Sequence, residues 1–444
     1  MGSVSVHARQ KRFRIKDPSR EAAAFFDNYL SPQSGGMEIN MKIINGGICA
    51  ANGFYASGVH CGVRKNRTKR DIALIYSEKP ASAAAVYTTN LVKGAPLTVT
   101  KNNIADGKAQ AVICNSGNAN TCNANGIEIA QKTCEMLAAE LKIPATDIVV
   151  ASTGVIGQPL NIEPISQGIP MLVKELSKNG GEAAAEGIMT TDTVKKEIAV
   201  EFTVGGKTCR IGGIAKGSGM IHPNMATMLV FITTDAAISP AMLQKALSND
   251  IADTFNMVSV DGDTSTNDMV AVLANGMAGN DEITAEGEDF DAFMKALNTV
   301  TIYLCRMIAG DGEGATKLLE CRVSGADDVK TAKTVAKSVI CSSLLKAAMF
   351  GADANWGRVL CAIGYSGAAV DVNSVDVSFK SAKGEIAVCK NGAGVDFSEE
   401  KAKEILLEKE IEILVSLGNG DCSATAWGCD LTYDYVKING DYRT

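Results

Sequence analysis

The feature that most constrains the fold of this 444-residue chain is an alternation of short apolar segments with amphipathic segments, which begins near Asn40. Segments rich in Val, Ile and Ala and bounded by Gly or Asn predict strands at 71–77, 84–88, 109–114, 147–151, 197–204 and 227–234. Apolar side chains at three- and four-residue spacing predict helices at 127–142, 241–255, 290–309 and 328–349. Strands that alternate with helices predict an α/β fold built in layers.

Composition and charge exclude several classes of protein. Apolar residues make up 46% of the chain and charged residues 21%, which is the balance of a globular protein and not of a disordered one. The length allows two or three domains, each with its own core. The net charge of −7 argues against binding to nucleic acid or to an anionic membrane. No segment approaches the roughly 18 apolar residues of a membrane-spanning helix, and the N-terminus has no apolar signal core, so we expect a cytoplasmic protein.

Cysteine and histidine usage limits the possible chemistry. The thirteen cysteines are scattered, without a Cys-x-x-Cys pair, and mostly lie in apolar runs, so we interpret them as reduced core residues, as at Cys114, Cys305 and Cys361. The chain has only three histidines, which leaves little for a zinc site or a serine-histidine-aspartate triad. We therefore expect no metal and no cofactor, and a nucleophile activated by a group other than histidine.

The first 36 residues differ from the rest of the chain. A basic stretch at 9–16 is followed by apolar residues at helical spacing over 19–30 and by Ser-Gly-Gly before Met37. We interpret residues 1–36 as an appendage, which is either a docking helix or a fusion segment.

Four segments are too rich in Gly, Asn, Thr and Asp to be explained by core packing, and each is predicted to be a loop. They are Asn115–Asn120, Ala151–Gly157, Lys216–Thr227 and Gly310–Lys317. Taken singly, each also fits a tight turn that needs positive φ.

Two motifs imitate ligand-binding loops and are rejected on context. Gly310-x-Gly312-x-x-Ala315 fits a relaxed dinucleotide fingerprint, but it follows a predicted helix and precedes a predicted strand at 317–323, which reverses the required order. Asp261-Gly-Asp-Thr-Ser imitates a calcium loop, yet its sixth position is Thr266 and its twelfth is Val272, where Gly and Glu are required.

Thr227 starts a predicted strand directly after the small residue Ala226. Its hydroxyl has the chemistry to attack the preceding carbonyl and form an ester, whose hydrolysis makes Thr227 a new N-terminal residue. The new α-amine has an ordinary pKa of about 8, so a useful fraction is neutral near pH 7 and can accept the hydroxyl proton. On spacing alone, a threonine that only begins a strand is the simpler interpretation.

The segment Lys216-Gly-Ser-Gly-Met-Ile-His-Pro-Asn-Met-Ala-Thr-Met-Leu229 resembles the cleavage-site signature of the ornithine acetyltransferase family, also called bifunctional glutamate N-acetyltransferases. The resemblance covers the chain from about Ile44 onward and includes segments 84–90, 115–120, 152–157, 261–268, 311–317, 352–358 and 435–444. Members of this family transfer an acetyl group from N-acetylornithine to glutamate in arginine biosynthesis, and some also accept acetyl-coenzyme A.

The resemblance implies specific roles. Thr227 would be the nucleophile that carries the acetyl group after cleavage between Ala226 and Thr227, and Thr153 and Gly154 would form the oxyanion hole. The implied substrate contacts are Thr190, Lys216, Thr227, Glu313, Asn439 and Thr444. A lysine is suited to pair with a substrate carboxylate, and a glutamate is suited to accept a substrate amine.

The resemblance also implies a layered α/β/β/α fold similar to that of N-terminal-nucleophile hydrolases. The self-processing precursor would give an alpha chain at 37–226 and a beta chain at 227–444, with residues 1–36 as an extension. The two fragments would stay associated and form a homo-oligomer of processed protomers.

Two other classes of protein remain open as alternatives. One is a self-processing aminopeptidase or amidase of similar architecture, in which water and not glutamate releases the acyl group. The other is a cargo or scaffold protein with residues 1–36 as its docking helix, although this does not account for polar loops spread over four hundred residues.

Overall fold

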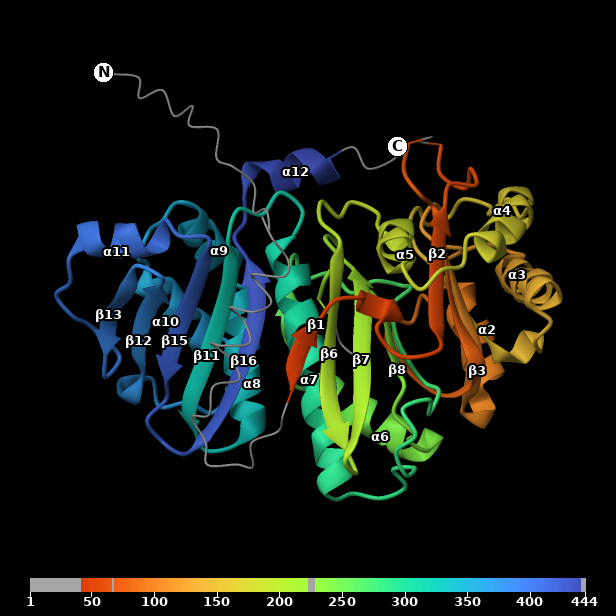
Figure 1. The fold of residues 1–444 in the computed structure, drawn as a ribbon. Helices are drawn as coiled ribbons and strands as arrows, with labels where there is room; N and C mark the ends of the chain where they lie inside the picture. The colour runs from red at the N-terminus through yellow and green to blue at the C-terminus, as the bar shows by residue number, and fades with distance from the viewer. Residues whose placement is uncertain (1–40, 66–67, 223–227, 441–444) are drawn as a thin grey trace. The chain divides into compact units, whose positions relative to one another are not determined.

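The computed structural model describes residues 41–65, 68–222 and 228–440 (Figure 1). These residues form two compact units, one within Asp17–Ile308 and the other within Ala309–Thr444. Each unit is built around a β-sheet with helices packed against it.

The sheet of the first unit has the strand order β1-β6-β7-β8-β10-β3-β4-β5, with β2 paired to β3. Most neighbours are antiparallel, but β8 and β10 are parallel, as are β4 and β5. The strands are β1 (Lys42–Ile44), β2 (Phe54–Val59), β3 (Ile72–Tyr87), β4 (Lys108–Asn115), β5 (Ile148–Ser152), β6 (Lys196–Val204), β7 (Lys207–Lys216), β8 (Leu229–Thr234) and β10 (Met269–Ala274). A short strand, β9 (Val258–Ser259), precedes β10.

Burial on both faces explains why several strands are continuously apolar. Along β3, Ile72 and Leu74 belong to one hydrophobic cluster, whereas Ala73 and Ile75 belong to another. β4 and β5 divide their side chains between the same two clusters. A strand covered on both faces loses the alternation of polar and apolar residues, and its sequence becomes an uninterrupted apolar run.

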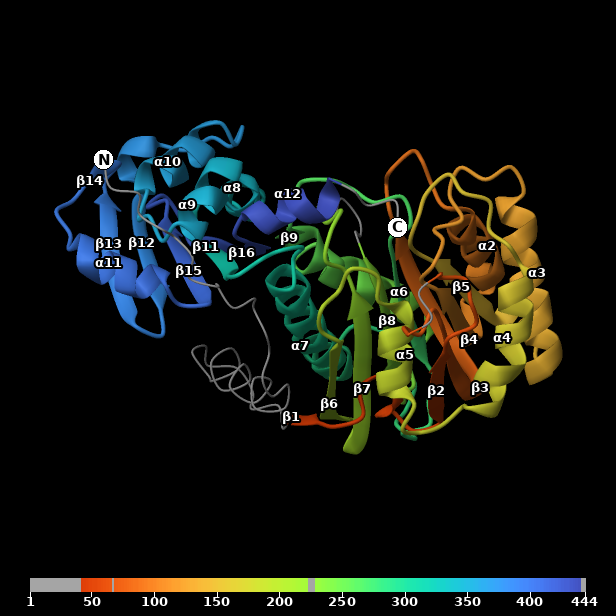
Figure 2. The ribbon, with the colours of Figure 1, turned by 90° about the horizontal axis from the view of Figure 1, so that it is seen from above.

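The helices of the first unit cover the two outer faces of a folded sheet (Figure 2). Helices α2, α3 and α4 pack against the β2–β5 part. Helix α6 packs on β3, and α7 lies against β6 through an edge-to-face contact of Phe202 with Phe293. Between the two parts, apolar side chains of β3–β5 meet those of β7, β8 and β10 in one core cluster, which also contains side chains of α5. The helices are α2 (Ala95–Asn103), α3 (Gly126–Leu141), α4 (Glu163–Lys174), α5 (Gly181–Ile188), α6 (Pro240–Ile251) and α7 (Glu288–Gly310).

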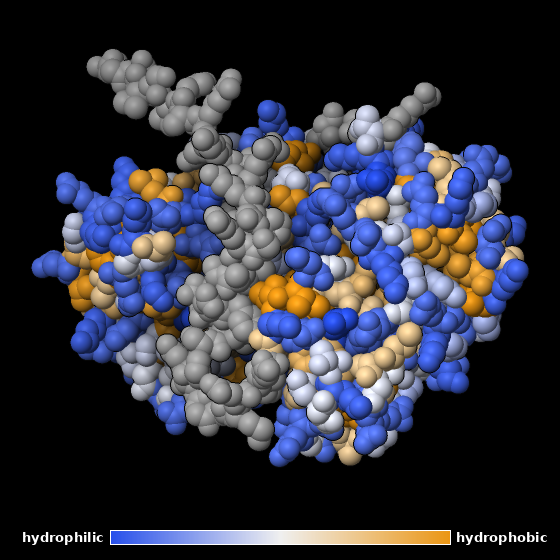
Figure 3. Space-filling model, viewed as in Figure 1, coloured by the Kyte–Doolittle hydropathy of each residue, from blue (hydrophilic) through white to orange (hydrophobic). Residues whose placement is uncertain are grey.

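This arrangement confirms the predicted layered α/β/β/α class. In the described part of the chain, every helix is too short or too polar to cross a lipid bilayer. The surface in Figure 3 is mainly hydrophilic with small, separate apolar patches, as the composition predicted for a globular protein.

The second unit holds a mainly antiparallel sheet with the strand order β14-β13-β12-β15-β11-β16. Helix α8 packs on β11 and β16, and α11 packs on β12 and β13. The strands are β11 (Leu318–Ala326), β12 (Asp376–Ser381), β13 (Gly384–Lys390), β14 (Ala393–Gly394), β15 (Glu410–Ser416) and β16 (Cys422–Cys429). The helices are α8 (Val329–Cys341), α9 (Ser343–Phe350), α10 (Trp356–Gly364), α11 (Glu399–Leu406) and α12 (Tyr433–Asn439).

Three sequence predictions are corrected by the structure. The strands expected at 71–77 and 84–88 are one strand, β3, whose pairing with β4 shifts register between Tyr76 and Ala81. The helix expected at 328–349 is broken at Ser342, where the serine hydroxyl accepts a hydrogen bond from the Leu345 N–H and starts α9. Cys361, expected in the core, is exposed because it lies opposite the buried face of α10.

Candidate active site

The predicted oxyanion residues, Thr153 and Gly154, form the turn that follows β5. The Thr153 N–H donates to the Asn115 carbonyl at 2.9 Å, so it is not available to a substrate. Within the described residues, neither the Thr153 hydroxyl nor the Gly154 N–H has a hydrogen-bond partner. Two free donors on adjacent residues can stabilise the negative oxygen of a tetrahedral intermediate.

Close backbone packing explains why position 154 is glycine. Gly154 has φ of 125°, a conformation that residues with a side chain rarely adopt. A Cβ atom at this position would lie 2.7 Å from the Gly117 carbonyl carbon and 2.9 Å from the Asn118 nitrogen. The turn therefore rests directly on the 115–118 loop, without side chains between them.

Asparagine side chains hold this pair of loops in place. The Asn115 Oδ1 atom accepts the N–H groups of Gly117 and Asn118, at 3.2 and 3.1 Å. The Asn267 Nδ2 atom donates to the Ala119 carbonyl at 2.6 Å and to the Ser152 carbonyl at 3.0 Å. Asn267 lies in the segment 261–268 that carries the family resemblance, and its amide joins the ends of both loops, a role that was not predicted from the sequence.

Lys216 lies at the end of β7, where it pairs with Leu229 of β8. Its side chain is buried, and among the described residues its ammonium has no hydrogen-bond or ion-pair partner. A buried ammonium without a direct hydrogen-bond partner can bind an anionic ligand.

Asp192 links Thr190 to the loop that follows Lys216. Its Oδ2 atom accepts the Thr190 N–H at 2.9 Å, and its Oδ1 atom accepts the Gly217 N–H and the Lys196 ammonium, both at 2.7 Å. Burial opposes ionisation of Asp192, but the charges of Lys196 and Lys216 and these hydrogen bonds hold its pKa below its ordinary value. Asp192 therefore stays ionised and keeps the two predicted substrate-binding positions together.

Asp268 is a second buried carboxyl group near Lys216. Burial raises the pKa of Asp268 well above its ordinary value, although a Ser265 hydrogen bond and the charge of Lys216 act in the opposite direction. Its Oδ2 atom is buried and lacks a hydrogen-bond partner in the described part of the chain. The backbone N–H of the next residue, Met269, donates to the Met228 carbonyl at 2.9 Å. The sequence analysis missed Asp268 as well, because only the fold brings it close to Lys216.

In the second unit, the structure brings together Glu313 and Asn439. The Asn439 Nδ2 atom donates to Glu313 Oε2 at 2.7 Å and to the Tyr435 carbonyl at 3.1 Å. A Cβ atom on Gly314 would lie 2.7 Å from the Tyr435 nitrogen, so the 313–317 loop lies directly against α12. The Glu313 Oε1 atom has no hydrogen-bond partner among the described residues and can accept a donor from a ligand.

Three predicted site residues, Ala226, Thr227 and Thr444, lie outside the described residues. His222, the last described residue before this gap, places its Nδ1 atom 3.1 Å from the Ser259 hydroxyl, and its carbonyl accepts the Thr264 hydroxyl. These contacts hold both the ring and the backbone of His222. Over the described residues, no group of three or more His, Cys, Asp or Glu side chains is arranged to hold a metal ion.

Hydrogen-bond donors without partners beside a strand end are suited to stabilise the oxyanion of an acyl-transfer reaction. The family model described as the ArgJ family matches residues 55–444. The chain belongs to the ArgJ family, and it is an acyltransferase.

A curated relative agrees with this assignment along its full length, and two solved structures share part of the sequence. The arginine biosynthesis bifunctional protein ArgJ of Caldanaerobacter subterraneus subsp. tengcongensis is 53% identical over 405 residues, which are 91% of this chain and 100% of the relative. A solved ArgJ structure from Bacillus halodurans is 48% identical and covers 48% of this chain and 97% of that chain, with a TM-score of 0.45. An ornithine acetyltransferase from Mycobacterium tuberculosis, solved with ornithine, is 35% identical and covers 42% of this chain and 100% of that chain, with a TM-score of 0.39.

Proposed function

We propose that the protein transfers the acetyl group of N-acetylornithine to glutamate through an acetyl-Thr227 intermediate. The observation that carries this proposal is the 53% identity to an ArgJ protein over the full length of that relative. The 35% identity to an ornithine acetyltransferase that was solved with ornithine supports the same donor.

The reaction would begin with cleavage of the chain between Ala226 and Thr227. The free α-amine of Thr227 then accepts the proton of its own hydroxyl while the oxygen attacks the acetyl carbonyl of N-acetylornithine. The Thr153 hydroxyl and the Gly154 N–H stabilise the resulting oxyanion, and each such donor contributes on the order of a hundredfold in rate. Collapse of the intermediate breaks the amide bond and returns the proton to ornithine, which leaves as an amine.

Glutamate completes the cycle. Its amine attacks the acetyl-Thr227 ester, the same donors hold the second oxyanion, and the Thr227 hydroxyl regains a proton when N-acetylglutamate leaves. This order of steps, with one product released before the second substrate reacts, is a ping-pong mechanism.

The other predicted residues would bind the two amino-acid substrates, which carry both positive and negative groups. The unpartnered ammonium of Lys216 favours a substrate carboxylate, whereas Glu313 favours a substrate amine. Thr190, Asn439 and Thr444 would supply further polar contacts.

An intact mass spectrum under denaturing conditions tests the nucleophile. Two species, one of which starts at Thr227, are expected for the wild type, and a Thr227→Ala variant should remain one chain. A single 46.5 kDa wild-type chain that nevertheless transfers acetyl groups would contradict the proposed nucleophile.

Release of the acetyl group tests the acceptor and distinguishes the transferase from an aminopeptidase or amidase. The enzyme is loaded with radiolabelled N-acetylornithine, and loss of label from the protein is followed with and without glutamate. The proposal predicts fast loss only with glutamate, and equal rates would favour hydrolysis by water. The same experiment with acetyl-coenzyme A as the donor shows whether the enzyme has a second acetyl source.

A further inference from the structure

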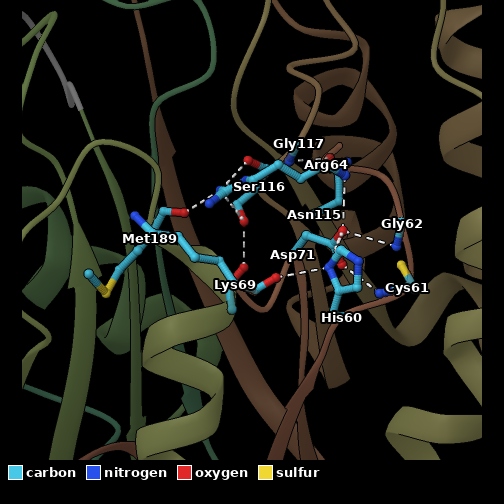
Figure 4. Close-up of polar contacts among 11 residues, drawn as sticks. His60, Cys61, Gly62, Arg64, Lys69, Asp71, Asn115, Ser116, Gly117 and Met189 are labelled. Atoms are coloured by element: carbon cyan, nitrogen blue, oxygen red, sulfur yellow. Dashed lines mark hydrogen bonds and ion pairs between the residues drawn. The ribbon is translucent and has the colours of Figure 1, made fainter. Parts of the chain in front are cut away.

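Arg64 lies between two loops of the candidate site and contacts both of them through one atom (Figure 4). Its Nη2 atom lies 2.7 Å from the Ser116 carbonyl oxygen and 2.9 Å from the Ser116 hydroxyl. The same atom lies 2.5 Å from the Met189 carbonyl oxygen. Ser116 belongs to the 115–118 loop, and Met189 precedes Thr190 in the 189–192 loop.

The backbone that carries Arg64 is itself fixed. The carboxylate of Asp71 is fully buried and accepts the N–H groups of Cys61, Gly62 and Arg64, at 2.7, 3.0 and 2.9 Å. The Asp71 carbonyl accepts the Ser116 N–H at 2.9 Å. Since Asp71 directly precedes β3, the segment 61–64 is anchored to the central sheet, and Arg64 reaches both loops from a rigid support.

Backbone packing carries this support to the oxyanion donors. A Cβ atom on Gly117 would lie 2.8 Å from the Val63 carbonyl carbon and 2.9 Å from the Arg64 nitrogen. Gly154 packs against the same loop at Gly117 and Asn118. Three backbone segments are thus stacked in direct contact, and a shift of the middle one displaces the free donors of Thr153 and Gly154.

The contact with Met189 carries the support to the predicted substrate loop. The carbonyl that Arg64 binds is one residue from Thr190, whose N–H is held by Asp192. The Ser116 hydroxyl also donates to the Gly187 carbonyl at 2.7 Å, so the 115–118 loop is joined as well to the last turn of α5, which leads into the 189–192 loop.

We propose that Arg64 is a positioning residue of the acyl-transfer site, which keeps the loop beneath the oxyanion donors and the loop that carries Thr190 at a fixed separation. Its place in the reaction rests on the proposed function. The support itself is a structural statement that can be measured without any substrate.

Substitution of Arg64 by lysine or by methionine distinguishes the loss of the N–H donors from a change in side-chain length. All three contacts come from one nitrogen, and a lysine ammonium also presents three N–H donors from one nitrogen. Arg64→Lys should therefore retain the function, whereas Arg64→Met keeps the chain length but removes every donor. Arg358→Met is the matched control, because the Arg358 Nη1 atom also donates to a backbone carbonyl, that of Leu344 at 2.6 Å, and both residues belong to the second unit.

The first measurement is hydrogen–deuterium exchange of peptides that cover 112–119 and 186–193. Arg64→Met should accelerate exchange in both peptides by about five- to thirtyfold, the effect of one or two lost hydrogen bonds, and Arg64→Lys should reverse most of the change. Arg358→Met should leave both peptides as in the wild type. Unchanged exchange in Arg64→Met, or acceleration in only one of the two peptides, would overturn the proposal.

The second measurement is acetyl transfer by the same variants. Displacement of the oxyanion donors should lower kcat/KM of Arg64→Met by about a hundredfold, mostly in kcat, with rescue in Arg64→Lys. Wild-type kcat in Arg64→Met would also overturn the positioning role. If the wild type does not transfer acetyl groups between these substrates while both loops respond in exchange, the structural support stands and the proposed function fails.

Discussion

Replacement of Gly154 by alanine gives the sharpest test of the oxyanion assignment, because the structure specifies two separate penalties. The added methyl group would lie 2.7 Å from the Gly117 carbonyl carbon and 2.9 Å from the Asn118 nitrogen, which is closer than van der Waals contact allows. Both of these atoms belong to the backbone, so they cannot move away by a side-chain rotation. The φ of 125° is also unfavourable for alanine. Strain of this kind costs about 1–3 kcal/mol, and overpacking costs a similar amount.

The matched control is Gly157→Ala, three residues further along the same turn. Gly157 also has positive φ, 75°, but a Cβ atom there meets no other atom within 4 Å. The control therefore carries the smaller conformational cost of a φ near the left-handed region and no steric clash. The difference between the two variants reports the contact between the turn and the 115–118 loop together with the additional backbone strain at position 154.

Acetyl transfer and thermal unfolding are measured for both variants. We expect Gly154→Ala to lower kcat by about 10²–10³, the effect of losing one oxyanion donor, and Gly157→Ala to change it by less than about threefold. The Tm of Gly154→Ala should fall by several degrees more than that of Gly157→Ala. A Gly154→Ala enzyme that is folded and has the kcat of its control would refute the assignment of the Gly154 N–H.

Three further predictions concern other parts of the molecule. Thr153→Val, which keeps the side-chain shape but removes the free hydroxyl, should lower kcat by about 10²–10³ while Thr153→Ser retains most activity, and equal kinetics of the two variants would exclude the hydroxyl as a donor. Burial raises the pKa of Asp250 to about 6, so folding favours its protonated form, and the stability of the wild type should fall by about 2 kcal/mol as the pH rises from about 4 to above 6. The unfolding free energy of Asp250→Asn, measured by denaturant titration at each pH, should not show this fall. The same pH dependence in Asp250→Asn and the wild type would contradict the assignment of the fall to Asp250. Ser342→Ala removes the side-chain cap of α9 and should cost about 1 kcal/mol of unfolding free energy, whereas the control Ser343→Ala, at an exposed position in the same helix, should cost much less.

The parts of the fold that could be predicted from sequence are those with strong local patterns. The runs at 109–114 and 147–151 are apolar because both faces of β4 and β5 are buried, and the structure confirms both strands. Glu78, Lys79 and Pro80 lie between the two strands that were predicted at 71–77 and 84–88. In the structure these three residues are exposed, but the strand continues through them, with a shift in its pairing to β4. Their polarity therefore reflects exposure to solvent and not the end of a strand.

The site shows where sequence reasoning reaches its limit. Thr153 and Gly154 could be named from a motif, but the motif does not reveal that the Thr153 N–H is already used by Asn115 and that the hydroxyl is the free donor. Arg64 and Asn267 act on loops that are distant along the chain, so no local periodicity or spacing predicts their contacts. The Gly-, Asn- and Thr-rich composition of the loops was the available signal, and it indicated where to look without indicating which atoms meet.

The strand order of the first sheet has a consequence for a chain cut between Ala226 and Thr227. Strands β8 and β10 follow that bond in sequence, yet they stand in the interior of the sheet, between β7 on one side and β3 on the other, and both of these precede the bond. Two adjacent strands of the later fragment therefore lie between strands of the earlier one, and backbone hydrogen bonds join them to it on both sides. Pulling the pieces apart would require both ladders to open together and would expose four strand edges at once. Two fragments that were produced separately would have difficulty in assembling, because the earlier fragment alone would lack the two strands that join β7 to β3.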